Sequence, residues 1–466
     1  MTDSFTYSTY LSPFTTRYGS SEMRHIWSEE FKRQTWRKVW VALAKAEEKQ
    51  GLLTKEELAD ITSHQQNIDI PRAKEREKEI YHELMAEIQT FAEQCKIGGG
   101  KIHVGATSTD ILDNTTVIQI KKSLRSMKQD LKELLTLFAQ KIEEHANTVC
   151  MGYTHLQPAE PTTLGYRLSF YAQDLLMDLA FLEKIEPMIL GKGIKGAVGT
   201  SASYVELLGS EEKAMQLEKD VLETLGIEAV LISHQTYPRK IDLLVIELLS
   251  NVAASLYKFA FDFRIMQSPL IGEWMEKRNA KRVGSSAMPF KRNPDKAEKV
   301  CSLCRYVSSH LQSAWANPAN SLLERTLDDS ASQRLFLPES FLAIDEAIST
   351  VKNLLTNLEI SQSSVNKNLE TFGQFAGTEV LLMRLVSEKH ADRQKIHELI
   401  KSCSMKVWQG RDSGQEISLV DTLFHEKEIS QHFSKDQLQK LLDPSSHIGL
   451  AKRRTYLVLN QLKKLL

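Results

Sequence analysis

The sequence carries almost no net charge, because 59 lysines and arginines are balanced by 60 aspartates and glutamates. This balance excludes a chain-wide attraction to nucleic acid or to an anionic membrane, so an anionic ligand must be held by a local group of cations. The N-terminal residues MTDSFTYSTY also lack the basic and then apolar order of a secretory signal. We therefore expect a cytoplasmic protein with no nucleic-acid partner and no membrane partner.

Cysteines are few, and their spacing forms no framework. The single CxxC pattern lies in a helix-like segment and has no second pair with which to share a metal. We interpret all the cysteines as reduced thiols and expect no metal site. They are Cys95, Cys150, Cys301, Cys304 and Cys403.

Long uncharged apolar runs are also missing. The most apolar long segment, residues 243–263, is interrupted by Glu247, Lys258 and Asp262. The pattern favours a buried core helix over a span of a lipid bilayer.

Glycine and proline are absent from residues 106–151, and this segment predicts one long helix. Roughly 40 residues at about 1.5 Å each would form a rod of about 60 Å. The length favours a bundle shared between subunits, and a core inside one subunit is the alternative. The apolar residues follow one another at spacings of three and four, as in a heptad stripe. They are Val117, Ile120, Leu124, Met127, Leu131, Leu134 and Phe138.

The rest of the chain is also mainly helical in pattern. Shorter helices are predicted before Gly98-Gly99-Gly100, and polar, interrupted helices with a turn near Asp443-Pro444 are predicted at the C-terminal end. Strand alternation is weak and limited to residues 228–232. Four further long helices are predicted at residues 164–190, 239–266, 295–317 and 339–358.

A chain of 466 residues exceeds a single typical core, so two or three domains are expected. The helical patterns predict an all-α fold with three domains. These are an N-terminal helical domain of residues 1–110, a central five-helix-bundle domain of residues 111–362, and a C-terminal helical domain of residues 363–466.

Residues 283–294, VGSSAMPFKRNP, combine hydroxyls and cations in a segment that cannot be helical throughout. Gly284 permits backbone conformations that other residues resist, and Pro289 and Pro294 interrupt a helix. Serines beside fixed N–H groups and cations could form and hold an anion. The pattern indicates a catalytic loop, and an ordinary surface turn is the alternative. The polar side chains are Ser285, Ser286, Lys291, Arg292 and Asn293.

Residues 154–165, THLQPAEPTTLG, place His155 in a proline-bounded loop just before a predicted helix. Because an imidazole titrates near neutrality, this side chain could lend a proton to a leaving nitrogen and take it back. A structural histidine is the alternative.

Residues 101–114, KIHVGATSTDILDN, place Thr107 and Ser108 at the start of the long helix, with Ser108 or Asp110 as its cap. Helix N-termini attract anions, so this segment could hold a carboxylate. Capping alone is the alternative. His103 lies just before the motif, and we interpret it as a supporting residue.

Residues 323–334, LERTLDDSASQR, carry Arg325, Ser330 and Arg334. If the chain turns or coils here, the two guanidinium groups could converge on a phosphate, for which their geometry is suited. The alternative is a helix entry in which the arginines pair with Asp328 and Asp329.

These four strings, in this chain, closely resemble the motifs of the fumarase/aspartase superfamily, and among its members those of the adenylosuccinate lyases. The resemblance extends from Arg17 to Arg334, while the last hundred residues match only in character. It implies an all-α, three-domain fold whose central long-helix bundle forms the core of a homotetramer. It also implies active sites that are shared between subunits.

The resemblance further implies β-elimination of fumarate from adenylosuccinate to give AMP in purine nucleotide biosynthesis, with no metal and no redox cofactor. The succinyl-aminoimidazole-carboxamide ribotide is implied as a second substrate. Ser285 would be the base, with Ser286 as the alternative, and His155 the acid. The implied substrate-binding residues are Arg17, Tyr18, His82, Glu83, Thr107, Ser108, Gln235, Lys291, Asn293 and Lys299, together with Arg325, Ser330 and Arg334 at the nucleotide phosphate.

Two positions depart from the family pattern. The chain has Tyr81-His82-Glu83 where the family commonly has Arg-His-Asp, and it has Lys299 where an arginine is usual. Lysine keeps the charge but loses the bidentate fork of arginine.

Two rival functions are considered. One is another lyase or a cycloisomerase of the superfamily, and the phosphate-directed residues of the LERTLDDSASQR segment weigh against it. The other is a catalytically silent helical scaffold, and intact Ser285, His155 and Lys291 weigh against that.

Overall fold

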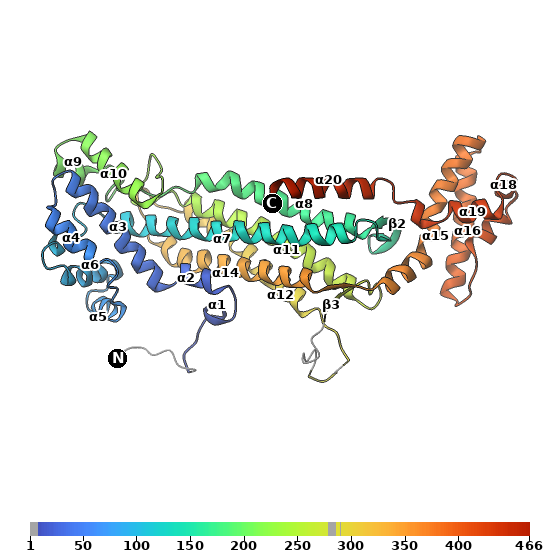
Figure 1. The fold of residues 1–466 in the computed structure, drawn as a ribbon, viewed down its shortest axis with the longest axis horizontal. Coiled ribbons are helices and arrows are strands. Elements are labelled where there is room, and N and C mark those ends of the chain that lie inside the picture. The colour runs from blue at the N-terminus through green and yellow to red at the C-terminus, as the bar shows by residue number, and fades with distance from the viewer. Residues whose placement is uncertain (1–7, 278–285, 289) are drawn as a thin grey trace. The chain divides into compact units, whose positions relative to one another are not determined.

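The computed structural model describes residues 8–277, 286–288 and 290–466, and in them most of the chain is helical and strands are few (Figure 1). The predicted all-α fold is therefore confirmed. Internal contacts divide the chain into two compact units. The first unit consists of Met1–Leu131, Met177–Tyr257 and Lys299–Thr350, and the second of Lys132–Leu176, Lys258–Glu298 and Val351–Leu466.

The first unit begins with short helices that end near the predicted glycine run. Serine and threonine side chains cap several of them, and Ser28 accepts the Phe31 N–H at the start of the longest. That helix, α3, buries Trp36 and Trp40 in an apolar core. The elements are α1 (Pro13–Thr16), α2 (Ser21–Ile26), α3 (Glu29–Lys49), α4 (Lys55–Ser63), α5 (Ile70–Ile80), α6 (Glu83–Gln94) and the 3-10 turn η1 (Gly99–Lys101).

The long helices follow the predicted pattern, with corrections at their ends. The last begins at Asp328 instead of residue 339, because the helix accommodates Pro338 in its interior. The predicted helix over 295–317 is two helices that separate at His310. The elements are α7 (Ser108–Glu144), α8 (Leu164–Ile185), η2 (Glu186–Met188), α9 (Ala202–Leu208), α10 (Glu211–Leu225), α11 (Lys240–Gln267), α12 (Asp295–Ser309), α13 (Leu311–Ala319) and α14 (Asp328–Thr356).

The heptad stripe of α7 is buried within a single chain. Its seven residues, from Val117 to Phe138, are at most 2% exposed. The stripe is thus a core feature of one chain, which was the alternative interpretation, and it is not evidence for an interface between chains.

Four strands were missed or misplaced by the sequence patterns. The predicted long helix over 106–151 stops at Glu144, and β1 (Val149–Thr154) then pairs antiparallel with β2 (Gln157–Thr163). A second antiparallel pair joins β3 (Trp274–Glu276) to β4 (Leu358–Ile360). The predicted strand at 228–232 contributes a single bridge between Ala229 and Gly191.

The second unit ends in a compact group of helices, among which a separate apolar core lies. The predicted turn near Asp443 is confirmed, since a 3-10 turn follows it directly. The elements are α15 (Gln362–Lys389), α16 (Arg393–Asp412), α17 (Leu419–Phe424), α18 (Lys427–Ser430), α19 (Lys435–Leu441), η3 (Pro444–Ser446) and α20 (Ala451–Leu465).

Helix α11 contains the most apolar segment of the chain. Among the described residues it is the one helix long and apolar enough to cross a membrane, yet 56% of its apolar window is buried inside the protein. Val245, Leu249 and Val252 are fully buried, so the prediction of a core helix is supported. All five cysteines are buried free thiols.

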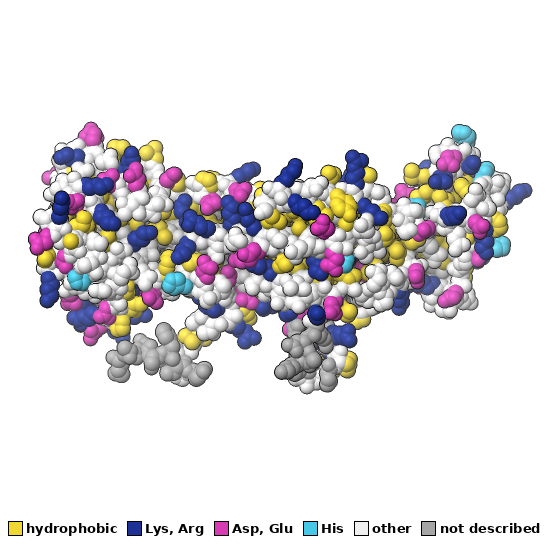
Figure 2. All heavy atoms as spheres, in the orientation of Figure 1, with side chains coloured by type: hydrophobic (Ala, Val, Ile, Leu, Met, Phe, Trp, Pro, Cys, Tyr) yellow, Lys and Arg dark blue, Asp and Glu magenta, His cyan; other side chains and the backbone are white. Residues whose placement is uncertain are grey.

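Figure 2 shows lysine, arginine, aspartate and glutamate side chains interspersed over the visible face, as the balanced composition predicts. Recognition of an anion is therefore a matter of local geometry.

A stability prediction follows from Glu47 on α3. This residue of the first unit is 1% exposed, and its Oε1 has no hydrogen-bond partner among the residues that the structure describes. Burial raises its pKa to about 8, against the opposing effect of Lys101. The folded state thus binds a proton that the unfolded state has lost, and this contribution to stability disappears as pH rises through about 8.

Glu47→Gln should remove this pH dependence. About two pH units, from roughly pH 6 to the folded pKa of about 8, contribute at about 1.4 kcal/mol each, so the stability of the variant relative to wild type should rise by about 3 kcal/mol between roughly pH 6 and pH 9. Urea unfolding at the two pH values measures the change. Glu48→Gln, at the neighbouring and more exposed position, is the control and should leave the wild-type dependence intact. If the stability of Glu47→Gln relative to wild type is the same at both pH values, the raised pKa of Glu47 is contradicted.

Candidate active site

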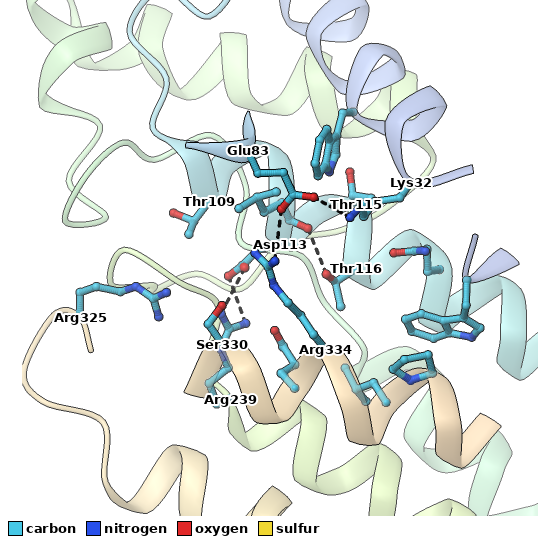
Figure 3. Close-up of a pocket in the computed structure, with 17 residues that line it drawn as sticks. Lys32, Glu83, Thr109, Asp113, Thr115, Thr116, Arg239, Arg325, Ser330 and Arg334 are labelled. Carbon is cyan, nitrogen blue, oxygen red and sulfur yellow. Dashed lines mark hydrogen bonds and ion pairs between the residues drawn. The ribbon is translucent and has the colours of Figure 1, made fainter. Parts of the chain in front are cut away.

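A cavity of about 220 Å³ in the first unit collects part of the predicted site (Figure 3). Its wall includes four of the predicted substrate-binding residues, which come from α6, α14 and the loop before α14. Cationic side chains outnumber carboxylates in the lining, so the cavity is suited to an anion. The predicted residues are Glu83, Arg325, Ser330 and Arg334, and the other charged residues are Lys32, Asp113 and Arg239.

The start of α14 arranges the predicted phosphate ligands. Ser330 and Arg334 lie four residues apart in the first turns of the helix, and therefore on one face. Arg325 precedes the helix, in a loop held by two contacts to residues 234 and 235. The His234 ring lies 2.9 Å from the Leu323 carbonyl oxygen, and the Gln235 N–H donates to the Glu324 carbonyl at 3.2 Å.

Glu83 is an internal counterion of this cavity. Its Oε1 accepts from Lys32 Nζ at 2.8 Å, and its Oε2 lies 3.3 Å from Arg334 Nη1. Figure 3 shows Arg334 reaching from α14 toward Glu83. The neighbouring His82 is used as a helix cap, because its Nδ1 accepts the Met85 N–H at 3.2 Å.

The start of α7 supports the cavity, although not with the predicted hydroxyls. Thr107 and Ser108 are absent from the lining, where Thr109 takes their place. The Thr109 hydroxyl donates to the Gln235 carbonyl, which fixes that predicted residue to α7. Asp110, one of the two predicted caps, accepts the Thr107 N–H at 2.8 Å.

Asp110 also holds the glycine-rich segment that follows α8. Its carboxylate is buried and accepts from the Lys192 ammonium and from the Lys195 and Gly196 N–H groups. His103 lies nearby with its Nδ1 accepting from Trp40 Nε1 at 3.1 Å, and burial lowers the pKa of this imidazole to about 4. A neutral, hydrogen-bonded imidazole fits the supporting role expected of it.

A buried network at the wall of the cavity was not found from the sequence. Arg239 reaches Asp113 through two N–H groups at 3.3 Å, and its Nε donates to Asp329 at 2.6 Å. Asp242 accepts from the Tyr237 hydroxyl and from Gln333, and burial raises the pKa of Asp242 to about 6. Nothing in a single sequence marks these partners, since most of the pairs are far apart in the chain.

Arg17, Tyr18 and Lys299 lie elsewhere in the first unit and do not line the cavity. Arg17 is the C-terminal cap residue of α1 and is exposed. Lys299 Nζ pairs with Glu346 Oε1 at 2.5 Å, and Glu346 Oε2 also accepts the Gly19 N–H. The lysine that replaces the usual arginine is thus neutralised by a neighbouring carboxylate.

In the second unit, His155 occupies the tip of a β-hairpin and not the loop that was predicted. Thr154 pairs with Gln157, so His155 and Leu156 form a two-residue turn. Their φ angles are 54° and 60°, as in a type I′ turn, a conformation that is costly for a leucine. Strained backbone of this kind is concentrated at functional sites. The His155 side chain is exposed.

The predicted catalytic loop is only partly described. Ser285 lies outside the described residues, and Ser286 is exposed. Lys291 and Asn293 line a cavity of about 870 Å³ in the second unit, to which Arg264, Lys277 and Arg292 also contribute. The wall of this cavity therefore carries several cations, of which Lys291 and Arg292 follow Ser286 closely in the sequence.

Comparisons with known proteins identify the family. A family model described as Lyase matches residues 15–308, and one described as Adenylosuccinate lyase C-terminus matches residues 374–455. Adenylosuccinate lyase of Schistosoma mansoni is 36% identical over 456 residues, which cover 97% of this chain and 94% of that protein. The chain belongs to the adenylosuccinate lyase family of the fumarase/aspartase superfamily. The Saccharomyces cerevisiae member is 35% identical over 452 residues, covering 96% of this chain and 93% of that protein.

Solved structures support the fold assignment. The 3-carboxy-cis,cis-muconate lactonizing enzyme of Pseudomonas putida has a TM-score of 0.85 at 23% identity, covering 97% of this chain and 99% of its own. A fumarate lyase from Mesorhizobium sp. BNC1 has a TM-score of 0.84 at 23% identity, with the same coverage. At such identities the likeness establishes the fold alone.

The cavity around Glu83 generates a prediction on anion binding. Glu83→Gln removes the internal negative charge that Lys32 and Arg334 now share. The affinity for inorganic phosphate should rise by about threefold, the value of a partly exposed ion pair. Calorimetric titration with phosphate measures it, and Glu75→Gln, which loses an exposed pair with Arg72, is the control. Unchanged or weaker binding to Glu83→Gln would refute the counterion role.

Proposed function

We propose that this protein is an adenylosuccinate lyase, which eliminates fumarate from adenylosuccinate to give AMP in purine nucleotide biosynthesis. The succinyl-aminoimidazole-carboxamide ribotide is its second substrate in this proposal. The observation that carries the proposal is the convergence of Arg325, Ser330 and Arg334 on one cavity, in a chain of this family. A nucleotide phosphate is the group that such a set would bind.

The reaction needs a base and an acid. The base takes a proton from the carbon next to a carboxylate, and the C–H electron pair becomes the double bond of fumarate. The C–N electron pair leaves with the nitrogen, which takes a proton from the acid. Ser285 is the proposed base and His155 the proposed acid.

The properties of the two catalytic segments support these roles. His155 is exposed at a strained turn, where its imidazole is available to a ligand. A serine hydroxyl is a poor base at its ordinary acidity, so the alkoxide requires stabilising donors and cations. Lys291 and Arg292 follow the serines closely in sequence, and both line the cavity of about 870 Å³ in the second unit. Lys291 and Asn293 are the proposed partners of the succinyl carboxylates.

The remaining predicted contacts complete the proposal. Thr107 and Ser108 would hold a carboxylate at the start of α7, with Gln235 beside them. Arg17, Tyr18, His82 and Lys299 are kept as substrate-binding residues by family resemblance. The mechanism needs no metal and no redox cofactor, because each step is a proton transfer or an elimination.

We further propose a cytoplasmic homotetramer whose active sites combine residues of different subunits. The predicted residues divide between the two compact units, with Arg325 in the first and His155 in the second. The three domains proposed from the sequence meet near residues 110 and 362, which fall close to the starts of α7 and α15.

An ultraviolet assay with purified protein and adenylosuccinate tests the function. Turnover to AMP and fumarate supports the proposal. Turnover of a non-phosphorylated substituted succinate alone would indicate the rival lyase, and no turnover of either would indicate a silent scaffold.

The choice of base is tested by serine variants. Ser285→Ala should lower kcat by roughly a thousandfold, because general-base catalysis is lost. Ser286→Ala should retain most of the turnover, and His155→Ala should lose it. If Ser286→Ala loses turnover while Ser285→Ala keeps it, the base is Ser286.

The assembly is tested by sedimentation and by mixing. The native mass should be about four times the 53.0 kDa chain. Mixing inactive Ser285→Ala and His155→Ala proteins after dissociation should restore part of the activity, since some sites regain both groups. A fully active monomer would rule out shared sites.

A further inference from the structure

Four alternating charges form a continuous series of ion pairs at the wall of the anion cavity. Asp113 on α7 holds Arg239, which donates from Nε to Asp329 Oδ2 at 2.6 Å. Asp329 Oδ1 in turn accepts from Arg325 Nη1 at 2.9 Å. The two arginines line the cavity and Asp329 does not. Asp329 thus lies behind the cavity wall, joined to both guanidinium groups.

The burial of these side chains limits the partners that Asp329 can have. The side chains of Asp329, Asp113 and Arg239 are 2%, 5% and 6% exposed, while that of Arg325 is 24% exposed. A carboxylate removed from water requires hydrogen-bonded cations, so Asp329 has few alternatives to these two partners. Of these four side chains, that of Arg325 remains accessible to a ligand.

These ion pairs orient the Arg325 guanidinium and leave most of its N–H groups available to a ligand. Apart from Nη1, the guanidinium N–H groups of Arg325 make no hydrogen bond within the described residues, and its backbone N–H donates to the Leu322 carbonyl at 3.0 Å. An arginine side chain is mobile by itself, and fixing it in advance removes an entropic cost that a ligand would otherwise bear. One bond to a buried carboxylate supplies this constraint and leaves the rest of the guanidinium fork free.

We propose that Asp329 is a positioning residue, which holds the Arg325 guanidinium at the cavity for the phosphate group of the substrate. Asp329 itself does not touch the ligand. The identity of the phosphate as part of a nucleotide rests on the proposed function, while the binding of phosphate as such does not.

The direction in which Asp329→Asn changes the affinity for phosphate distinguishes a positioning role from simple electrostatics. Asp329→Asn removes a negative charge close to a cationic cavity, and by Coulomb attraction alone phosphate would then bind more tightly. If Asp329 acts by orienting Arg325, the same change weakens phosphate binding despite the gain in positive charge. The two accounts therefore predict opposite shifts of one dissociation constant.

The test compares Asp329→Asn with Asp328→Asn in the full-length protein. Asp328 is the adjacent residue of the same helix and accepts from the Thr326 hydroxyl, so its variant makes a matched loss of charge. Asp329→Asn should raise the dissociation constant for inorganic phosphate by about tenfold, and Asp328→Asn by less than about twofold. With adenylosuccinate, Asp329→Asn should raise KM by a similar factor and change kcat by less than about twofold.

A double-mutant comparison keeps the inference testable if Asp329→Asn folds poorly. Asp329→Glu keeps the charge, and its displaced carboxylate should raise the phosphate dissociation constant by an intermediate factor. In an Arg325→Ala background, Asp329→Glu should have no further effect, because the group it positions is gone. Circular dichroism and thermal melting establish that each variant is folded.

The outcomes are decisive in either direction. The proposal is overturned if a folded Asp329 variant binds phosphate as tightly as wild type or more tightly. It is also overturned if Asp328→Asn loses as much phosphate affinity as Asp329→Asn, or if Asp329→Glu still loses its full share of affinity in the Arg325→Ala background. Phosphate binding is measured without turnover. A wild type that fails to cleave adenylosuccinate would therefore refute the proposed function and leave the test of Asp329 intact.

Discussion

The neutralisation of buried carboxylates at the start of α7 is the constraint on which the site depends. Asp110 and Asp113 lie within the first two turns of the helix, and both are almost inaccessible to water. A buried charge is tolerated only with hydrogen-bonded partners, and these partners come from segments distant in sequence. Asp110 thereby fixes the segment around Lys192, and Asp113 fixes Arg239 and the Tyr237 N–H.

The same constraint makes the anion cavity a preorganised one. Its cations are held by carboxylates of the protein itself: Lys32 and Arg334 by Glu83, and Arg325 by a buried aspartate. A phosphate entering the cavity has to compete with Glu83, which lies inside it, and is assisted by the groups behind it. Such a balance favours specific, reversible binding over a simple excess of positive charge.

Much of the fold could be predicted from the sequence, because helix periodicity and the Gly and Pro positions are local signals. The apolar stripe of α7 followed from its spacing, and the core helix α11 from the charges that interrupt its apolar run. The hairpin around His155 could not be predicted, since its second strand contains Pro158 and Pro161 and its turn has two positive φ angles at non-glycine residues. Motif resemblance found Arg325, Ser330 and Arg334, and the pair of Arg325 with Asp329 was the alternative interpretation of that segment. Folding alone brings Lys32 to Glu83 and Arg239 to Asp329.

The burial of all five cysteines gives the protein a built-in reporter. A thiol reagent can reach a buried sulfur only when the surrounding structure opens, so the modification rate follows local unfolding and not surface chemistry. Cys95 belongs to one compact unit and Cys403 to the other. Mass spectrometry of the two labelled peptides would therefore time the opening of each unit separately, in the unmodified wild-type chain.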